Sequence, residues 1–162
     1  MEADEQQAKD VDSDVRWLSA TEQDAWLTVG MMMLSLSGPL DAQLQRDSNL
    51  TLFEYLVLSS LSMAPDEQVR MSELARLVNG SLSRLSNVAK RLESQGWLVR
   101  APDPADGRYT VARLTPSGRR VVVAAAPGHV ETVRKLVIDP LTPAQLRTLA
   151  EIGRRIRAAN EC

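Results

Sequence analysis

The stretch that decides the fold is residues 71–118, which read MSELARLVNGSLSRLSNVAKRLESQGWLVRAPDPADGRYTVARLTPSG. It begins with a short apolar-patterned segment, a turn at Asn79-Gly80 and a longer segment rich in Ser, Arg, Asn and Lys. Two strand-like segments follow, separated by the loop PDPADGR. A protein with this order can place one helix in a DNA major groove and a basic hairpin beside it.

The first part of the stretch predicts two helices joined by a turn. Ser72 is expected to cap a short helix that ends near Val78, and Ser81 is expected to cap the next one. Asn79-Gly80 between them tolerates a positive φ. Apolar side chains recur at helical spacing, so each helix should bury one face, made of Leu74, Leu77 and Val78 in the first and Leu85, Val88, Ala89 and Leu92 in the second.

The opposite face of the second helix carries the candidate DNA contacts, which are Ser81, Ser83, Arg84, Asn87, Lys90 and Arg91. Arg84 and Asn87 are the best candidates for reading bases, because Arg pairs with guanine and Asn with adenine in the major groove. Lys90 and Arg91 suit phosphate contacts. Taken alone, the same residues also fit a solvated polar face on an amphipathic helix.

The second part of the stretch predicts a β-hairpin. Gly96 is placed to end the helix in a left-handed conformation, and residues 97–101 and 109–114 are patterned as strands. Asp106 and Gly107 are expected to shape the turn between them. Arg108 leaves the tip of this hairpin, where it has the reach and charge to enter a minor groove. The predicted fold class is therefore mainly α with a small β-wing, a winged helix-turn-helix with long helices outside it.

The charge distribution supports a nucleic-acid surface in the same stretch. The net charge of the chain is −2, but residues 1–69 carry 3 Lys/Arg and 13 Asp/Glu, whereas residues 70–120 carry 10 Lys/Arg and 4 Asp/Glu. The positive field is thus confined to the segment that has the helix-turn-helix pattern.

Composition argues against membrane, metal and enzyme functions. No run approaches the roughly 18 apolar residues of a membrane span, and the acidic N-terminus does not resemble a signal peptide, so we expect a cytoplasmic protein. One cysteine, Cys162, and one histidine, His129, cannot form a typical metal site. The chain contains no P-loop, H-E-x-x-H or G-x-S-x-G motif. We therefore expect neither catalysis nor a cofactor.

The regions outside the winged segment are predicted to be an acidic leader and long helices. Residues 1–19 are expected to be disordered, whereas residues 20–48 and 116–160 are expected to form a helical dimerisation region around a DNA-binding domain of residues 49–115. Thr21, the Thr51 and Glu54 pair, Thr115 and the Thr142 and Gln145 pair resemble helix starts. Gly38-Pro39 should bend the first long helix without necessarily ending it.

Two apolar stripes in these long helices predict an assembly of two chains. They comprise Trp26, Val29, Met33, Leu36 and Leu40 near the N-terminus, and Leu146, Leu149, Ile152 and Ile156 near the C-terminus. A small winged domain cannot cover both stripes, so pairing with a second copy is the simplest way to bury them. The alternative is packing of both stripes within one chain.

The winged segment resembles the MarR family, the multiple-antibiotic-resistance type of regulators. The matching pieces are Leu74-Ala75, Ser-x-x-Arg-Leu at residues 81–85, Arg91-Leu92-Glu93, Gly96, Arg100, Asp103-Pro104-x-Asp106-Gly107-Arg108 and Leu114-Thr115-x-x-Gly118. The resemblance covers roughly residues 20–160. It implies a homodimer that binds a near-palindromic double-stranded DNA operator, usually as a repressor, and that is released by a small, often aromatic effector. It also assigns the major groove to residues 81–91 and the minor groove to Arg108.

Two questions stay open at the level of the sequence. No residue can be assigned to the effector pocket: Trp26 and Met31, Met32 and Met33 fit a core or dimer seam better than a pocket, His129 fits a partly exposed surface position, and Cys162 fits a frayed terminus rather than a redox switch. The alternative function is a winged-helix protein-interaction module that has lost DNA binding. Catalysis has no support in either case.

Overall fold

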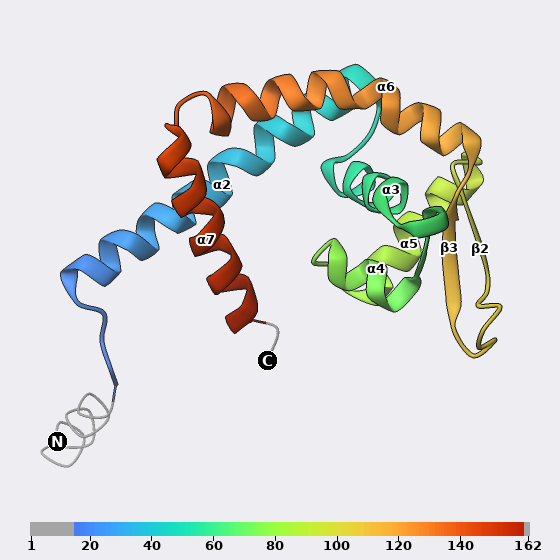
Figure 1. Ribbon diagram of the computed structural model, residues 1–162, viewed down its shortest axis with the longest axis horizontal. Coiled ribbons are helices and arrows are strands. Elements are labelled where there is room, and N and C mark those ends of the chain that lie inside the picture. The colour runs from blue at the N-terminus through green and yellow to red at the C-terminus, as the bar shows by residue number, and fades with distance from the viewer. Residues whose placement is uncertain (1–14, 161–162) are drawn as a thin grey trace, which may run out of the picture. The chain divides into compact units, whose positions relative to one another are not determined.

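The computed structural model describes residues 15–160, so the expected disorder of residues 1–14 and the role of Cys162 lie outside the described residues. The elements in chain order are α2 (Ala20–Ser48), α3 (Leu52–Met63), the 3-10 turn η1 (Pro65–Glu67), β1 (Gln68–Arg70), α4 (Met71–Leu77), α5 (Leu82–Ser94), β2 (Leu98–Pro102), β3 (Thr110–Leu114), α6 (Pro116–Val133), the π-helical segment η2 (Arg134–Ile138) and α7 (Pro143–Ala159) (Figure 1). The predicted fold class, mainly α with a small β-wing, is confirmed. No described helix is long and apolar enough to cross a membrane.

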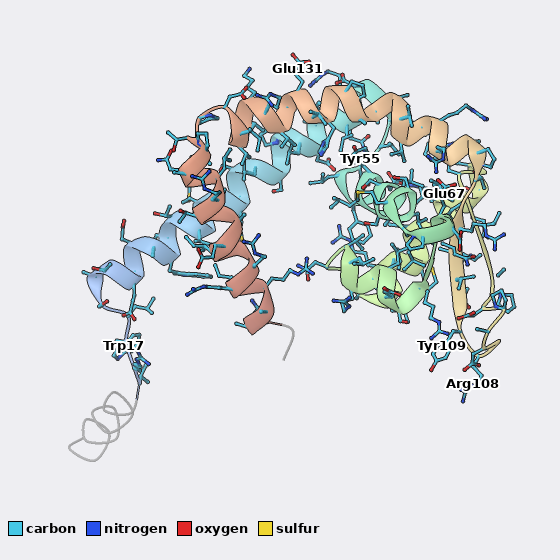
Figure 2. All side chains as sticks on the ribbon, in the orientation of Figure 1. Trp17, Tyr55, Glu67, Arg108, Tyr109 and Glu131 are labelled. Carbon is cyan, nitrogen blue, oxygen red and sulfur yellow. The ribbon has the colours of Figure 1, made fainter. Side chains whose placement is uncertain are left out.

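The chain divides into two compact units, one ending at Leu36 and the other beginning at Ser37. In the first unit, Ser19 and Glu22 form a reciprocal cap, in which the Ser19 backbone N–H donates to Glu22 Oε2 over 2.8 Å. The prediction that Thr21 caps this helix is therefore wrong, because the reciprocal cap is formed by Ser19, two residues earlier, with Glu22. Apolar side chains of this unit remain exposed, including Trp17 (Figure 2), Trp26, Met31 and Met33.

The second unit holds the hydrophobic core of the winged domain. Its largest fully buried side chains come from five elements: Leu44 of α2, Leu58 and Leu61 of α3, Leu74 of α4, Leu85 and Leu92 of α5, and Leu98 of β2. Burial of each such side chain stabilises the folded state by about 1.5–3 kcal/mol. These contacts orient α5 by its apolar face and leave its polar face outside.

Most of the predicted helix starts are confirmed. Thr51 and Thr142 form complete capping boxes, and the side chains of Ser81 and Thr115 accept hydrogen bonds from backbone N–H groups in the first turns of α5 and α6. The Ser72 cap is wrong, because α4 begins at Met71 directly after β1 and Arg70 occupies the cap position without a side-chain hydrogen bond.

One expectation about burial is also wrong. Leu77 is 43% exposed although Leu74 and Val78 are buried, because the 7-residue α4 buries only one narrow stripe. His129 is half-buried, in keeping with the partly exposed position expected of it, and its ring lies against that of Tyr55 with 4.5 Å between centroids. Tyr55 (Figure 2) is itself buried in α3, so His129 is part of the α3–α6 packing.

The sheet has three antiparallel strands in the order β1-β3-β2. The two wing strands were predicted to within one residue, whereas the 3-residue β1 was missed. In this sheet Val69 lies opposite Ala112, and Arg100 lies opposite Ala112 on the other side. Gly96 has a φ of 71° before β2, as the left-handed helix end requires. Together these elements set the hairpin beside α5.

Candidate nucleic-acid interface

The exposed face of α5 contains all six residues that the sequence predicted there, namely Ser81, Ser83, Arg84, Asn87, Lys90 and Arg91. Leu85, Ala89 and Leu92 on the opposite face have no exposed surface. At the start of the helix, the Ser81 hydroxyl oxygen accepts a hydrogen bond from the Arg84 N–H over 3.2 Å. The helix therefore offers a row of polar and basic side chains that its buried face holds in place.

Arg84 lies on an aromatic ring that sequence analysis did not identify. Its guanidinium carbon is 4.0 Å from the centroid of the Phe53 ring, which belongs to α3. The same ring packs against the turn of the helix-turn-helix, since a Cβ on Gly80 would lie 2.8 Å from Phe53 Cζ. Phe53 thus packs against both the turn and Arg84, the candidate base reader. Its contact with Arg84 is a cation–π arrangement that leaves the edge of the guanidinium group exposed.

Arg91 is tied to a buried carboxylate. Its guanidinium forms an ion pair with Glu54, whose side chain is almost fully buried and also accepts hydrogen bonds from the Thr51 backbone and hydroxyl. Burial raises the pKa of Glu54, but the hydrogen bonds from Arg91 and Thr51 outweigh it and hold the pKa below its ordinary value. The Arg91 side chain remains 57% exposed, so a phosphate can still reach it. The phosphate contact itself stays a prediction.

The wing presents Arg108 at its end (Figure 2). This side chain is 84% exposed, and its Nη2 lies 2.6 Å from Asp106 Oδ2. Asp106 Oδ1 also accepts the Arg108 backbone N–H over 3.2 Å, and these hydrogen bonds lower the pKa of Asp106. Asp106 thus makes the contacts expected of a residue that shapes the wing. Gly107 does not adopt a left-handed φ, so the turn does not require a glycine for that reason.

Two ion pairs anchor the wing strands and were not predicted. Arg100 of β2 donates from Nη2 to Glu93 Oε2 over 2.7 Å, which joins the hairpin to the last turns of α5. Arg70 of β1 donates from Nε to Asp103 Oδ2 over 2.5 Å, at the start of the wing loop. The second pair spans 33 residues, and no local pattern in the sequence indicates it.

A cavity of about 700 Å³ adjoins α5. Its wall combines Gly38 and Asp41 of α2, Phe53 and Leu56 of α3, and Arg84 and Arg91 of α5. The wall does not include Trp26 or Met31–Met33, which the sequence favoured for a core or dimer seam rather than a pocket. Among residues 15–160, no cluster of His, Cys, Asp and Glu side chains is placed to hold a metal ion.

Comparison with known proteins gives one consistent result. The profile of the MarR family matches residues 48–108. The HTH-type transcriptional regulator YxaD of Bacillus subtilis is 31% identical over 100 residues, which span 60% of this chain and 67% of YxaD.

Solved structures extend the likeness beyond the winged segment. Sco3205, a MarR family transcriptional regulator from Streptomyces coelicolor crystallised in complex with DNA, is 41% identical over 88% of this chain and 89% of its own, with a TM-score of 0.83. AbsC, a MarR family transcriptional regulator from the same organism, is 35% identical over 91% of this chain and 99% of its own, with a TM-score of 0.84. The chain therefore belongs to the MarR family and is a DNA-binding transcriptional regulator, not an enzyme.

Proposed function

We propose that this protein is a homodimeric repressor that binds a near-palindromic operator and responds to a small, often aromatic ligand. In this proposal residues 49–115 bind DNA, while residues 20–48 and 116–160 join the two chains. The observation that carries it is the exposed row on α5 together with the exposed Arg108 at the end of the wing. The 41% identity to Sco3205, which was crystallised in complex with DNA, supports DNA binding by this chain.

The division of labour follows from side-chain chemistry. Arg84 and Asn87 read base edges in the major groove, because both form paired hydrogen bonds with purines. Ser81, Ser83, Lys90 and Arg91 contact phosphates and set the register of the helix. Arg108 enters the minor groove, where its contact with the groove replaces its pairing with Asp106.

The exposed apolar side chains support dimerisation. Trp26 and Met33 of α2 are 59% and 55% exposed, and Ile152 and Ile156 of α7 are 47% and 48% exposed. Apolar side chains repeated along helix faces in this way mark an interaction surface in a soluble protein. A second copy covers them in the proposal, and its two-fold symmetry places two α5 helices on half-sites about 34 Å apart.

The cavity beside α5 supports ligand control. Phe53, Leu56 and Val88 give it an apolar wall suited to an aromatic ring, while Arg84 and Arg91 bring guanidinium groups to it. These two arginines also belong to the DNA-facing row. A ligand that orders them inside the cavity withdraws them from DNA, so its binding lowers operator affinity.

Selection of bound duplexes from a random pool tests the proposal. We expect an inverted repeat, a dimer by light scattering, and a loss of about 10³–10⁵ in affinity between 50 and 200 mM salt if six to ten phosphates are contacted. The competing hypothesis, an interaction module without DNA binding, gains support if Arg84→Ala and Arg108→Ala both leave binding to the selected duplex unchanged.

A further inference from the structure

Hydrogen bonds within the wing loop define its shape. The Asp103 N–H donates to the Tyr109 carbonyl over 2.9 Å, and the Tyr109 N–H donates to the Asp106 carbonyl over 3.0 Å. Asp103 Oδ1 accepts the Ala105 N–H over 2.9 Å. All these hydrogen bonds lie inside residues 103–109, so they determine the shape of the loop but not its direction relative to α5.

Arg70 connects this loop to the rest of the winged unit. Its Nε donates to Asp103 Oδ2 over 2.5 Å, and its Cζ lies 4.6 Å from the centroid of the Tyr109 ring. Asp103 begins the loop and Tyr109 ends it, so one guanidinium contacts both of its ends. Asp103 is 91% buried, which makes this ion pair more shielded from water than the Arg108–Asp106 pair at the tip.

The backbone of Arg70 is held as firmly as its side chain. It is the last residue of β1, where it lies opposite Val111 of β3, and it is also the residue directly before α4. Because α4 is the first helix of the helix-turn-helix, Arg70 joins the DNA-reading helices to the wing loop through a single residue.

We propose that Arg70 is a positioning residue that directs the wing, so that Arg108 reaches the minor groove while α5 occupies the major groove. The link to Arg108 is the Tyr109 ring: the Cζ atoms of Arg70 and Arg108 lie 4.6 and 6.0 Å from its centroid. Figure 2 shows Tyr109 and Arg108 together at the end of the hairpin. The inference rests on the proposed function, because it requires the wing to contact DNA.

A double-mutant cycle on the selected operator tests this role. We compare R70M, R108A and R70M/R108A by fluorescence anisotropy at fixed salt. R108A should lose about tenfold in affinity and R70M about three- to tenfold, while the double variant should lose no more than R108A alone. This non-additivity is expected because a misdirected Arg108 has no contact left to lose.

Arg113 provides the matched control. It lies on β3, and its Nη2 donates to Gln68 of β1 over 2.8 Å, so R113M also removes a guanidinium hydrogen bond that involves β1. It leaves the wing loop untouched. Any loss of affinity in R113M should therefore add to that of R108A. Arg70→Lys, which keeps a positive charge near Asp103, should restore part of the affinity that R70M loses.

Footprinting separates positioning from general destabilisation. On the selected duplex, R70M should lose protection of the minor grooves flanking the site while central protection by α5 persists. Equal loss at both places overturns the inference, as does additivity of R70M with R108A. If R70M does not fold, D103N serves as the second variant. It removes the charge that pairs with Arg70, while Oδ1 of the new asparagine still accepts the Ala105 N–H. If R108A binds the operator as tightly as the unmodified protein, the wing contact itself is overturned. That failure is distinct from additivity in the cycle.

Discussion

Gly118 is the position where a single methyl group should cost this fold most. It lies in the first turn of α6 against the carbonyl of Trp97. A Cβ there would overlap the Trp97 carbonyl oxygen and lie 2.8 Å from Leu114 Cδ1. Real Cβ atoms essentially never approach within 3.0 Å of such atoms, so Gly118→Ala forces α6 away from the segment that enters β2.

The magnitude follows from what that movement disturbs. The Thr115 N–H donates to the Trp97 carbonyl over 3.0 Å, and its hydroxyl donates to the Gly96 carbonyl over 2.7 Å. Weakening these bonds costs about 1–3 kcal/mol, and overpacking costs about another 1–3 kcal/mol. The better helix propensity of alanine offsets at most about 1 kcal/mol. We expect the free energy of unfolding to fall by about 3 kcal/mol.

Urea unfolding followed by far-UV circular dichroism measures this loss at a fixed protein concentration. With an m-value of about 2 kcal/mol/M, the midpoint should fall by about 1.5 M. Gly107→Ala is the control, because nothing lies within 4 Å of the new Cβ and no left-handed φ is needed; its stability should rise by about 0.5 kcal/mol. A midpoint for Gly118→Ala within about 0.2 M of the unmodified protein would refute the packing argument.

Four further outcomes are expected. Arg84→Ala should cost about 1–3 kcal/mol in operator binding and relax base preference, measured by competition with single-base variants of the selected site. Lys90→Ala should weaken all sequences about equally and reduce the salt slope by about 1, so a sequence-dependent loss would contradict its phosphate role. Glu54→Gln should lower the free energy of unfolding by about 1–2 kcal/mol in urea titrations. This value is reduced for solvent screening, because its partner Arg91 is more than half exposed. Adding Arg91→Met to Glu54→Gln should lower the stability little further. Burial lowers the pKa of His129 below 6.5, because it disfavours the charged imidazolium. The stability that the neutral ring contributes is therefore present above pH 6.5. It is lost as the pH falls below that value, by at most about 1.4 kcal/mol per pH unit. His129→Phe should reduce the stability difference between pH 7 and 5, and an unchanged difference would show that His129 does not carry it.

Local patterns were sufficient for much of the fold and for the candidate surface. The caps at Thr51, Ser81, Thr115 and Thr142 and the left-handed φ of Gly96 were predicted correctly, since each involves side-chain and backbone groups within one helical turn. The exposed row on α5 was predicted because helical periodicity alone divides a buried face from an outer one.

Two features were missed because a neighbouring element decided the outcome. The Ser72 cap failed because β1, too short to leave a pattern, runs directly into α4. The contact between His129 and Tyr55 was not predicted, because Tyr55 belongs to a different helix. In both cases the residue's own segment contained no trace of the partner.

The amino-acid sequence alone determined where most of the helices begin, most of the faces that they bury, and that a basic hairpin follows a polar helix. Those properties depend on residues within about four positions of one another along a helix. Only the tertiary structure decided the partners of two arginines at and beside the candidate interface: Arg91 with Glu54, 37 residues away, and Arg70 with Asp103, 33 residues away. An arginine carries the same charge beside any carboxylate, so its partner is chosen by the packing of the elements that bring the two together.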